Sequence, residues 1–305
     1  MINMKNGIAI YITALMICAG GLMAQTYKPY TMGAKTNGTV TGVEMKVKTV
    51  LRAGNFEILG TYQPANDAKR KVIVISSGQL KKAVRQTGGM RGFASALRVA
   101  ITKENGHINV SYTTPEYWGA AYFQKDYPKV KALIQGISTK LKTVLSPLGT
   151  GSGWQFGSKS GMTIKDLKGY HYMFGMPYFD DNITLHTYAS YDEAVRTIDG
   201  NFKRGMKNLV KVYEVALPGQ KIKLYGVGLM GPDGESNFLP TIDFNHPLHT
   251  AFLPYEMLVY KNKVYMLHGR FRIAIAFPDL SMGTFMKIVS TPGFIEKQLK
   301  RASAK

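Results

Sequence analysis

Residues 251–288 carry the β-hairpin pattern that most constrains how this chain can fold. Residues 255–267 alternate apolar and polar side chains on either side of Lys261-Asn262-Lys263, where Asn262 can adopt the left-handed backbone conformation of a tight turn. Residues 270–277 are rich in Ile, Ala and Phe and predict a third, more buried strand. Pro278 ends that strand because proline lacks a backbone N–H donor. The stretch therefore predicts the centre of a β-sheet.

The first half of the sequence predicts the same kinds of element. An Asn-Gly pair in Glu104-Asn105-Gly106 separates two alternating strands, at residues 97–102 and 107–113, which is a strong hairpin signal. An amphipathic helix follows at residues 127–145, and its apolar stripe suits packing on the sheet or, as an alternative, contact with a membrane surface. The elements predicted ahead of the hairpin are a strand at 38–42, a helix at 43–53, strands at 56–62 and 71–76, and a helix at 79–85.

The second half repeats this order of elements. Ser190 and Glu193 form the capping-box pattern that opens a helix at residues 191–203. A Pro-acid pair follows a predicted strand in each half, at Pro115-Glu116 and at Pro278-Asp279. The other predicted elements are strands at 182–188, 209–216 and 221–228, an insertion at 231–254 in place of the second helix, and a closing basic helix at 293–300.

These patterns together predict an α+β fold, an α/β two-layer sandwich made of two similar β-α-β-β-α-β-β modules in tandem. We assign residues 25–145 to the first module and 169–305, with its insertion at 231–254, to the second. A Gly/Ser-rich linker at residues 146–168 joins the two modules.

The pattern resembles modules of the domain-of-unknown-function family numbered 302. In the first half the likeness is carried by the segments VLRAGNFEILGTYQP, KVIVISSGQLKKAV and LRVAITKENGHINVSYTTPEY. In the second half it is carried by SYDEAVRTID, FLPYEMLVYKNKVYML and FRIAIAFPD. The resemblance implies a two-layer sandwich of this order in an exported protein, and it implies no biochemical role.

The first 24 residues have the pattern of a secretory signal peptide. A single charge, Lys5, precedes an apolar run, and the small residue Ala24 stands at the expected cleavage point. We expect cleavage near Ala24 and localisation in the periplasm of a Gram-negative cell or secretion. An uncleaved membrane anchor is one alternative. A lipoprotein attached at Cys18 is another, which Ile17 disfavours because such signals need a small residue there.

Cysteine content and charge narrow the chemistry that the chain can support. Cys18 is the only cysteine, so cleavage leaves a chain that cannot form disulfides, iron–sulfur clusters, thiolate zinc sites or cysteine nucleophiles. The formal charge is +20, and removal of Lys5 leaves +19. An exported protein of this charge favours an anionic small molecule, an acidic envelope partner or peripheral contact with lipid headgroups, whereas export argues against nucleic acid.

Two groups of residues could bind a metal ion. His246 and His249 lie in the insertion with Asp243 and Glu235, and imidazole and carboxylate ligands suit zinc or copper. Pro247 disfavours the helix that would bring the two imidazoles together, so a polar loop lining a cleft is the alternative. The second group consists of His171, Met173 and Met176, whose imidazole and thioether side chains suit Cu(I). Their aromatic neighbours Tyr172, Phe174 and Tyr178 favour the alternative, a structural contact in an aromatic core.

Arg270 and Arg272 form the candidate anion site. On a strand, side chains two residues apart point to the same face, so both guanidinium groups could bind one carboxylate or phosphate. Ion pairs with Glu256 or Asp279 would explain these arginines equally well. Acid–base chemistry is a further hypothesis, and it would pair Asp180-Asp181 with Asp243, Glu235 or Glu256.

The sequence contains no G-x-S-x-G, H-E-x-x-H or phosphate-loop motif, and Ser158 breaks the nearest approach to the last of these, at residues 153–160. We therefore expect a non-enzymatic exported binding or accessory protein without a cofactor, whose anionic ligand binds between the modules. The alternative is a copper- or zinc-binding protein or a metal-dependent enzyme that uses His246 and His249, or His171 with the two methionines. The expected ligand-binding residues are Arg270, Arg272, Glu256, Tyr255, His249 and His171.

Overall fold

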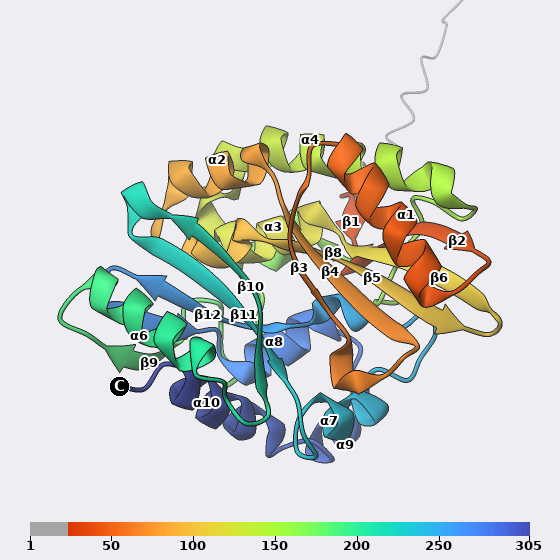
Figure 1. Cartoon of the computed structure of the whole chain (residues 1–305). Coiled ribbons are helices and arrows are strands. Elements are labelled where there is room, and N and C mark those ends of the chain that lie inside the picture. The colour runs from red at the N-terminus through yellow and green to blue at the C-terminus, as the bar shows by residue number, and fades with distance from the viewer. Residues whose placement is uncertain (1–23) are drawn as a thin grey trace, which may run out of the picture.

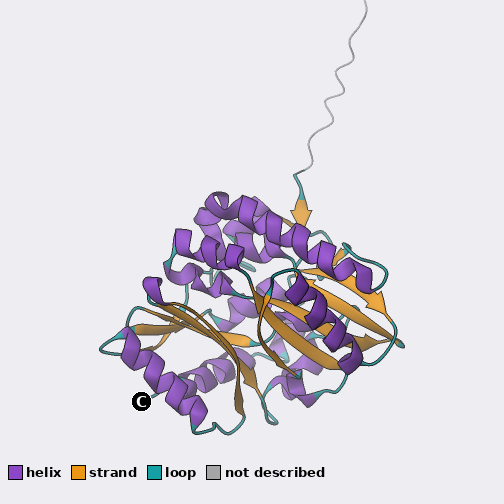
Figure 2. Ribbon diagram, turned by 45° about the horizontal axis from the view of Figure 1, so that its top comes forward, coloured by secondary structure: helices purple, strands orange, loops and turns teal. Residues whose placement is uncertain are grey.

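Two antiparallel β-sheets with helices packed over them form an α+β fold, seen in a computed structural model that describes residues 24–305 (Figure 1). The predicted signal segment up to residue 23, with Cys18, lies outside the described residues. The sheets lie side by side with helices over their outer faces (Figure 2), whereas the helices at residues 115–123 and 269–276 are buried in the interior. None of the helices in residues 24–305 is both long and apolar enough to cross a membrane.

The first sheet has the strand order β3-β4-β5-β6-β2-β7. The helices α1, α2 and α4 pack against one another over it, at the top of Figure 1, and α3 is buried along its whole length. The strands are β2 (Tyr30–Thr36), β3 (Glu57–Tyr62), β4 (Arg70–Ser76), β5 (Leu97–Glu104), β6 (His107–Thr113) and β7 (Gln155–Phe156). The helices are α1 (Val40–Ala53), α2 (Gly78–Thr87), α3 (Pro115–Phe123) and α4 (Tyr127–Leu145).

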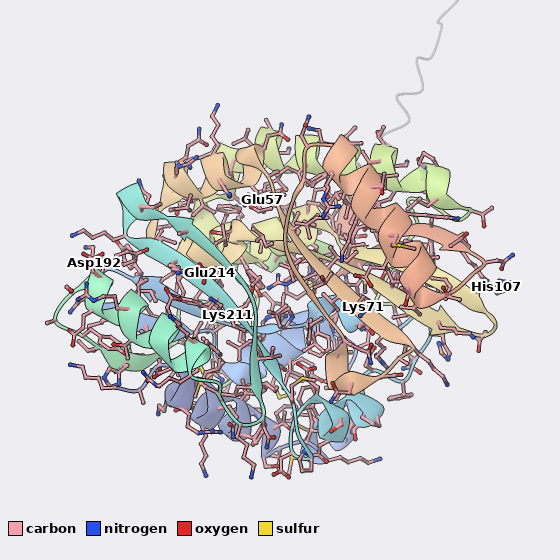
Figure 3. All side chains as sticks on the ribbon, in the orientation of Figure 1. Glu57, Lys71, His107, Asp192, Lys211 and Glu214 are labelled. Atoms are coloured by element: carbon pink, nitrogen blue, oxygen red, sulfur yellow. The ribbon has the colours of Figure 1, made fainter. Side chains whose placement is uncertain are left out.

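The second sheet has the strand order β10-β11-β12-β13-β9 and is covered by α6 and α10. Lys223 on the sheet contacts Asp199 on α6 at 2.9 Å and Glu214 at 3.1 Å, and Figure 3 shows Glu214 beside Lys211 on β10. The strands are β9 (Ile183–Thr187), β10 (Leu209–Leu217), β11 (Ile222–Leu229), β12 (Tyr255–Tyr260) and β13 (Lys263–Met266). The helices are α6 (Tyr191–Lys203), α7 (Glu235–Ile242), α8 (Gly269–Ala276), α9 (Met282–Met286) and α10 (Thr291–Ala302).

The segment predicted to be a linker adds short elements to the first half. β7 pairs with β2, and β8 pairs with β1 in a separate two-stranded sheet. These elements are β1 (Thr26–Tyr27), β8 (Met162–Thr163) and α5 (Ile164–Lys168).

Both halves follow the order strand, helix, strand, strand, helix, strand, strand, and corresponding strands take the same places in the two sheets. The first helix of each half begins in the same way, because the side chain of Thr39 accepts from the backbone N–H of Gly42 and that of Ser190 from Glu193. The hairpins at residues 97–113 and 255–266 and the helices at 127–145 and 191–203 are confirmed.

Residues 270–277 were predicted to be a strand, and this prediction is wrong because they form most of helix α8. The side chain of His268 caps this helix by accepting from the backbone N–H of Arg270 at 3.2 Å. All but Arg270 of its eight residues are buried, so the helix lacks the polar face that periodicity would reveal. Successive helical residues turn by about 100°, so Arg270 and Arg272 point in different directions. Arg270 is exposed and Arg272 is buried.

Four smaller predictions also need correction. The first strand lies at Tyr30–Thr36 rather than 38–42, where Thr39 instead starts α1. In the turn after β12, Lys261 rather than Asn262 has the positive φ, of 55°. The insertion contains a helix, α7. The two Pro-acid pairs do not correspond, because Pro115 opens α3 whereas Pro278 follows α8.

The edge strands β3 and β10 contact each other where the two sheets meet. Each strand has a β-bulge at the contact, at Leu59 between Ile58 and Gly60 and at Val212 between Lys211 and Tyr213. A Cβ atom on Gly60 would lie 2.0 Å from the carbonyl oxygen of Val212. The absence of a side chain at Gly60 therefore permits the close approach of the two backbones.

We predict that Gly60→Ala destabilises the protein by about 1–3 kcal/mol, because the added methyl group forces the two edge strands apart. Gly78→Ala is the matched control, since nothing lies within 4 Å of its Cβ position and it changes stability by at most about 1 kcal/mol. Urea denaturation of both variants measures the difference. Equal stabilities would show that the strands do not approach closely.

Candidate ligand-binding cleft

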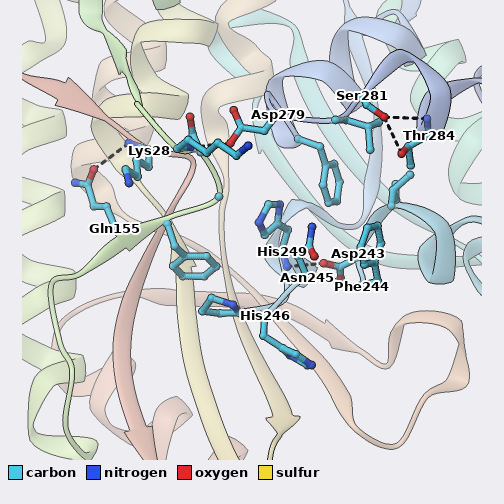
Figure 4. A pocket seen from close by; sticks show the side chains of 18 of the residues that line it. Lys28, Gln155, Asp243, Phe244, Asn245, His246, His249, Asp279, Ser281 and Thr284 are labelled. Carbon is cyan, nitrogen blue, oxygen red and sulfur yellow. Dashed lines mark hydrogen bonds between the residues drawn. The ribbon is translucent and has the colours of Figure 1, made fainter.

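A cleft of about 450 Å³ lies between segments from the two halves of the chain. One wall comes from the first half, from Lys28 and residues 154–159 around β7, and the other from residues 242–249 after α7 and 277–284 after α8. Figure 4 shows the side chains of both walls directed toward the same space. The pairing of β7 with β2 fixes the first wall to the sheet, with Phe156 opposite Tyr30.

Aromatic rings line the floor of the cleft. The ring centroid of His249 is 4.8 Å from that of Tyr30 and 4.8 Å from that of Phe277, on which it stacks at an interplanar angle of 25°. Trp154 stacks on Phe156 at 5.6 Å and 22°, yet 56% of its surface is exposed. An exposed tryptophan on an aromatic floor offers a flat face to a planar ligand group.

His249 is held in place through its backbone and its ring contacts. Its N–H donates to Asp243 Oδ1 at 2.5 Å, while its own Nδ1 has no hydrogen-bond partner within residues 24–305. Burial lowers the pKa of His249, and the carboxylate of Asp243 opposes this shift. The lowered pKa favours the neutral imidazole at pH 7, and its Nδ1 is buried beneath the surface of the cleft.

Lys28 and Lys159 lie at the cleft. In the described part of the chain, neither ammonium group has an acidic partner within 4 Å. Their backbone N–H groups fix their positions, since Lys28 donates to Gln155 Oε1 at 2.9 Å and Lys159 donates to Asp279 Oδ2 at 2.6 Å. A cleft with unpaired ammonium groups attracts an anion.

The structure does not bring the four predicted metal ligands together. Asp243 is buried and accepts hydrogen bonds from Arg70, Thr250 and the backbone of His249. His246 instead contacts Glu104 of β5, with 2.6 Å between Nδ1 and Oε2. Within residues 24–305, no group of three or more His, Cys, Asp or Glu side chains is arranged to hold a metal ion.

Glu235, the fourth of these residues, is fully buried away from the cleft lining. It accepts hydrogen bonds from the backbone N–H groups of Ala65 at 3.0 Å and Leu229 at 3.1 Å, and from the hydroxyl of Tyr62 at 3.3 Å. Burial raises its pKa to about 7, and the three hydrogen bonds oppose the shift. Glu235 therefore links the two halves, because Tyr62 and Ala65 belong to the first.

The other predicted site residues lie outside the cleft. Tyr255, Glu256 and Arg272 are buried in the core between the sheets. Arg270 lies near Met176 on the surface. The ring of His171 packs on Tyr178 at 4.4 Å, and Met173 is exposed. In the adjacent aspartates, Asp180 contacts Arg91 at 3.2 Å and Asp181 accepts from the backbone N–H of Tyr178 at 2.9 Å.

Among the cleft residues, His246, His249, Asp243 and Asp279 were named from the sequence, and residues 153–160 were considered only as a broken phosphate-loop motif. No binding role was assigned to Lys28, Trp154, Phe156 or Lys159. Trp154 and Phe156 interrupt an otherwise Gly- and Ser-rich segment, and this is the signal that could have identified them. Aromatic side chains are unusual in a flexible linker.

No protein-family model matches the chain, and no curated protein matches it. Among solved structures, it is similar to an uncharacterized conserved protein DUF302 from Bacillus stearothermophilus. The likeness covers 39% of this chain and 97% of that one, at 11% sequence identity and a TM-score of 0.34.

The raised pKa of Glu235 predicts a pH dependence of stability. The pKa of a glutamate in the unfolded chain is ~4.3, well below that of Glu235 in the folded protein. Because the folded protein binds this proton more tightly, the free energy of unfolding falls as the pH rises from about 4.5 through 7. Relative to Glu235→Gln, the wild type should lose roughly 3 kcal/mol between about pH 4.5 and pH 8. Urea denaturation across this range measures the difference, and parallel curves for the two proteins would contradict the shift.

Proposed function

We propose that the protein is an exported, non-enzymatic binding protein whose cleft binds a small anionic ligand with a planar group. The observation that carries the proposal is the combination of two lysines without acidic partners and an exposed aromatic surface in one cleft. Phe244, which is 55% exposed, lines the same space as Trp154. Large exposed aromatic side chains gathered in a cleft are typical of a binding site.

The division of roles in the cleft follows from its chemistry. The exposed ring of Trp154, which stacks on the buried ring of Phe156, would stack on the planar part of the ligand. Lys28 and Lys159 would bind its anionic group as point charges that adapt to several geometries. His249 would contribute the ring surface that it presents to the cleft, since its Nδ1 is buried.

We also infer that the two halves are copies of one module of the kind found in the family numbered 302. The equal strand order of the two sheets and the matching N-caps at Thr39 and Ser190 support this inference. The binding cleft would then belong to neither copy alone, since each contributes one wall.

A set of three isosteric ligands tests the proposal. Benzoate, benzamide and benzamidine share a planar shape but carry a negative, a neutral and a positive group, and we expect benzoate to bind most tightly. The chain has two tryptophans, and Trp118 is buried, so fluorescence of Trp154 reports on the cleft. Trp154→Phe should remove the signal while isothermal titration still detects binding.

Alanine substitutions of the two cleft lysines are compared with the substitution of a lysine outside the cleft. Lys28→Ala and Lys159→Ala should each weaken benzoate binding by roughly two- to fivefold, the effect of a partly exposed charge pair of up to ~1 kcal/mol. Lys46→Ala on α1, an exposed lysine remote from the cleft lining, should leave binding unchanged. Equal affinity for the three ligands, or equal effects of the three substitutions, would contradict an anion site.

Metal binding stays the alternative prediction. Elemental analysis of protein purified from its native compartment distinguishes the two functions, because stoichiometric copper or zinc would favour the alternative. The His171→Ala variant then tests whether the soft ligands at residues 171–176 hold Cu(I).

A further inference from the structure

A second group of polar side chains lies in the core between the two sheets, and none of it lines the cleft. Arg98 on β5, Glu256 on β12 and Arg272 on α8 are only 1%, 5% and 2% exposed. The guanidinium of Arg98 contacts Glu256 Oε1, which also accepts from the hydroxyl of Tyr213 at 2.7 Å. Arg272 Nε lies 3.7 Å from Glu256 Oε2.

Several hydrogen-bond donors of this cluster have no partner within the described residues. They are Arg98 Nε, both Nε and Nη1 of Arg272, and the hydroxyl groups of Tyr122 and Tyr255, all of them buried. One acceptor of the cluster, Glu256 Oε2, is also without a hydrogen-bond partner among these residues. Each buried group left without a partner costs about 1–3 kcal/mol. Aromatic rings shield Arg272 further, with its Cζ 4.9 Å from the ring of Trp118 and 6.0 Å from that of Tyr255.

The formal charges of the cluster do not balance. Two guanidinium groups face one carboxylate, so the cluster carries one net positive charge in the protein interior. An arginine stays protonated even when buried, and the interior strongly disfavours an uncompensated charge. A negative ligand would balance the charge and accept hydrogen bonds from the free donors that it contacts.

The space beside the cluster limits the size of such a ligand. A cavity of about 10 Å³ is lined by Arg98, Trp118 and Tyr122 among apolar side chains, whereas Arg272 and Glu256 do not line it. A cavity of this size admits about one water-sized probe. Phosphate or a carboxylic acid would be too large, whereas a single-atom ion needs only a small adjustment of the neighbouring side chains.

We propose that this cluster is a buried binding site for one monovalent anion of the size of chloride or bromide. Arg98 and Tyr122 would contact the ion directly, and Arg272 would supply the second positive charge. Glu256 would hold the two arginines in place and also weaken the binding of the ion by repulsion. The ion would stabilise the contact between the two halves, because β5 belongs to the first and α8 to the second.

The experiment measures thermal unfolding of the mature full-length protein, prepared without halide, as sodium gluconate is replaced by sodium bromide at constant ionic strength. We expect the Tm to rise with bromide concentration, because an ion that binds only the folded state stabilises it by mass action. Arg272→Met should abolish this rise, whereas Arg52→Met, an exposed arginine on α1, should preserve it. A Tm that bromide does not raise would overturn the proposal.

Two further variants separate an anion site from a structural ion-pair cluster. Glu256→Gln removes the opposing charge, so half of the Tm rise should occur at a bromide concentration at least about tenfold lower. Tyr122→Phe removes one hydrogen-bond donor but keeps all charges, so half of the Tm rise should require a higher bromide concentration than in the wild type. This variant replaces Arg272→Met as the test if Arg272→Met does not fold. A Glu256→Gln protein that is merely less stable, with no greater response to bromide, would overturn the proposal.

Bromide also locates the ion directly. A crystal grown in sodium bromide and measured at the bromine absorption edge should show an anomalous peak beside the guanidinium group of Arg98 and the hydroxyl of Tyr122. Peaks confined to surface lysines would overturn the proposal.

Discussion

The contact between Arg98 and Glu256 is the interaction on which the arrangement of the two sheets depends. Both side chains are almost fully buried, and each comes from a different sheet. Removing Glu256 would leave the guanidinium groups of Arg98 and Arg272 without a carboxylate, and loss of a buried charge partner costs about 3–5 kcal/mol. The pair therefore favours the placement of the sheets that brings Glu256 to Arg98 over placements in which Arg98 would be buried without a carboxylate. Tyr213 and Arg272 supply the surrounding polar contacts.

The two partners occupy corresponding positions in their sheets. Each lies on the third strand of its sheet, counted from the edge strand at the contact. Each is paired with a residue of the second strand, which is itself paired with the first residue after the bulge in the edge strand. Trp118 and Arg272 also correspond, since each lies four residues after the N-cap of its helix, and they stack on each other. The chains of pairing are Gly60, Val74 and Arg98 in one sheet and Tyr213, Gly226 and Glu256 in the other. Residues at corresponding positions of the two halves therefore contact each other, and their side chains differ in charge, Arg98 with Glu256 and Trp118 with Arg272.

The elements that were predicted correctly are those with a clear local sequence pattern, such as an apolar stripe, alternation or a turn dipeptide. The helix at Tyr127–Leu145 has a clear apolar stripe, and the hairpin around Asn105-Gly106 combines alternation with a turn dipeptide. The buried helix α8 shows neither signal, since eight mostly apolar residues suit a buried strand equally well. The cleft was only partly predictable, because Trp154 reaches it through the pairing of Phe156 with Tyr30, far away in the sequence.

The bulges at Leu59 and Val212 have a consequence for association with other chains. A regular edge strand presents a row of unpaired N–H and C=O groups on which another strand can add. In this protein, two such edges face each other without joining into one continuous ladder, because the bulges twist both strands at the point of closest approach. Each half thereby covers the most aggregation-prone border of the other, a protection that a separated half would lose.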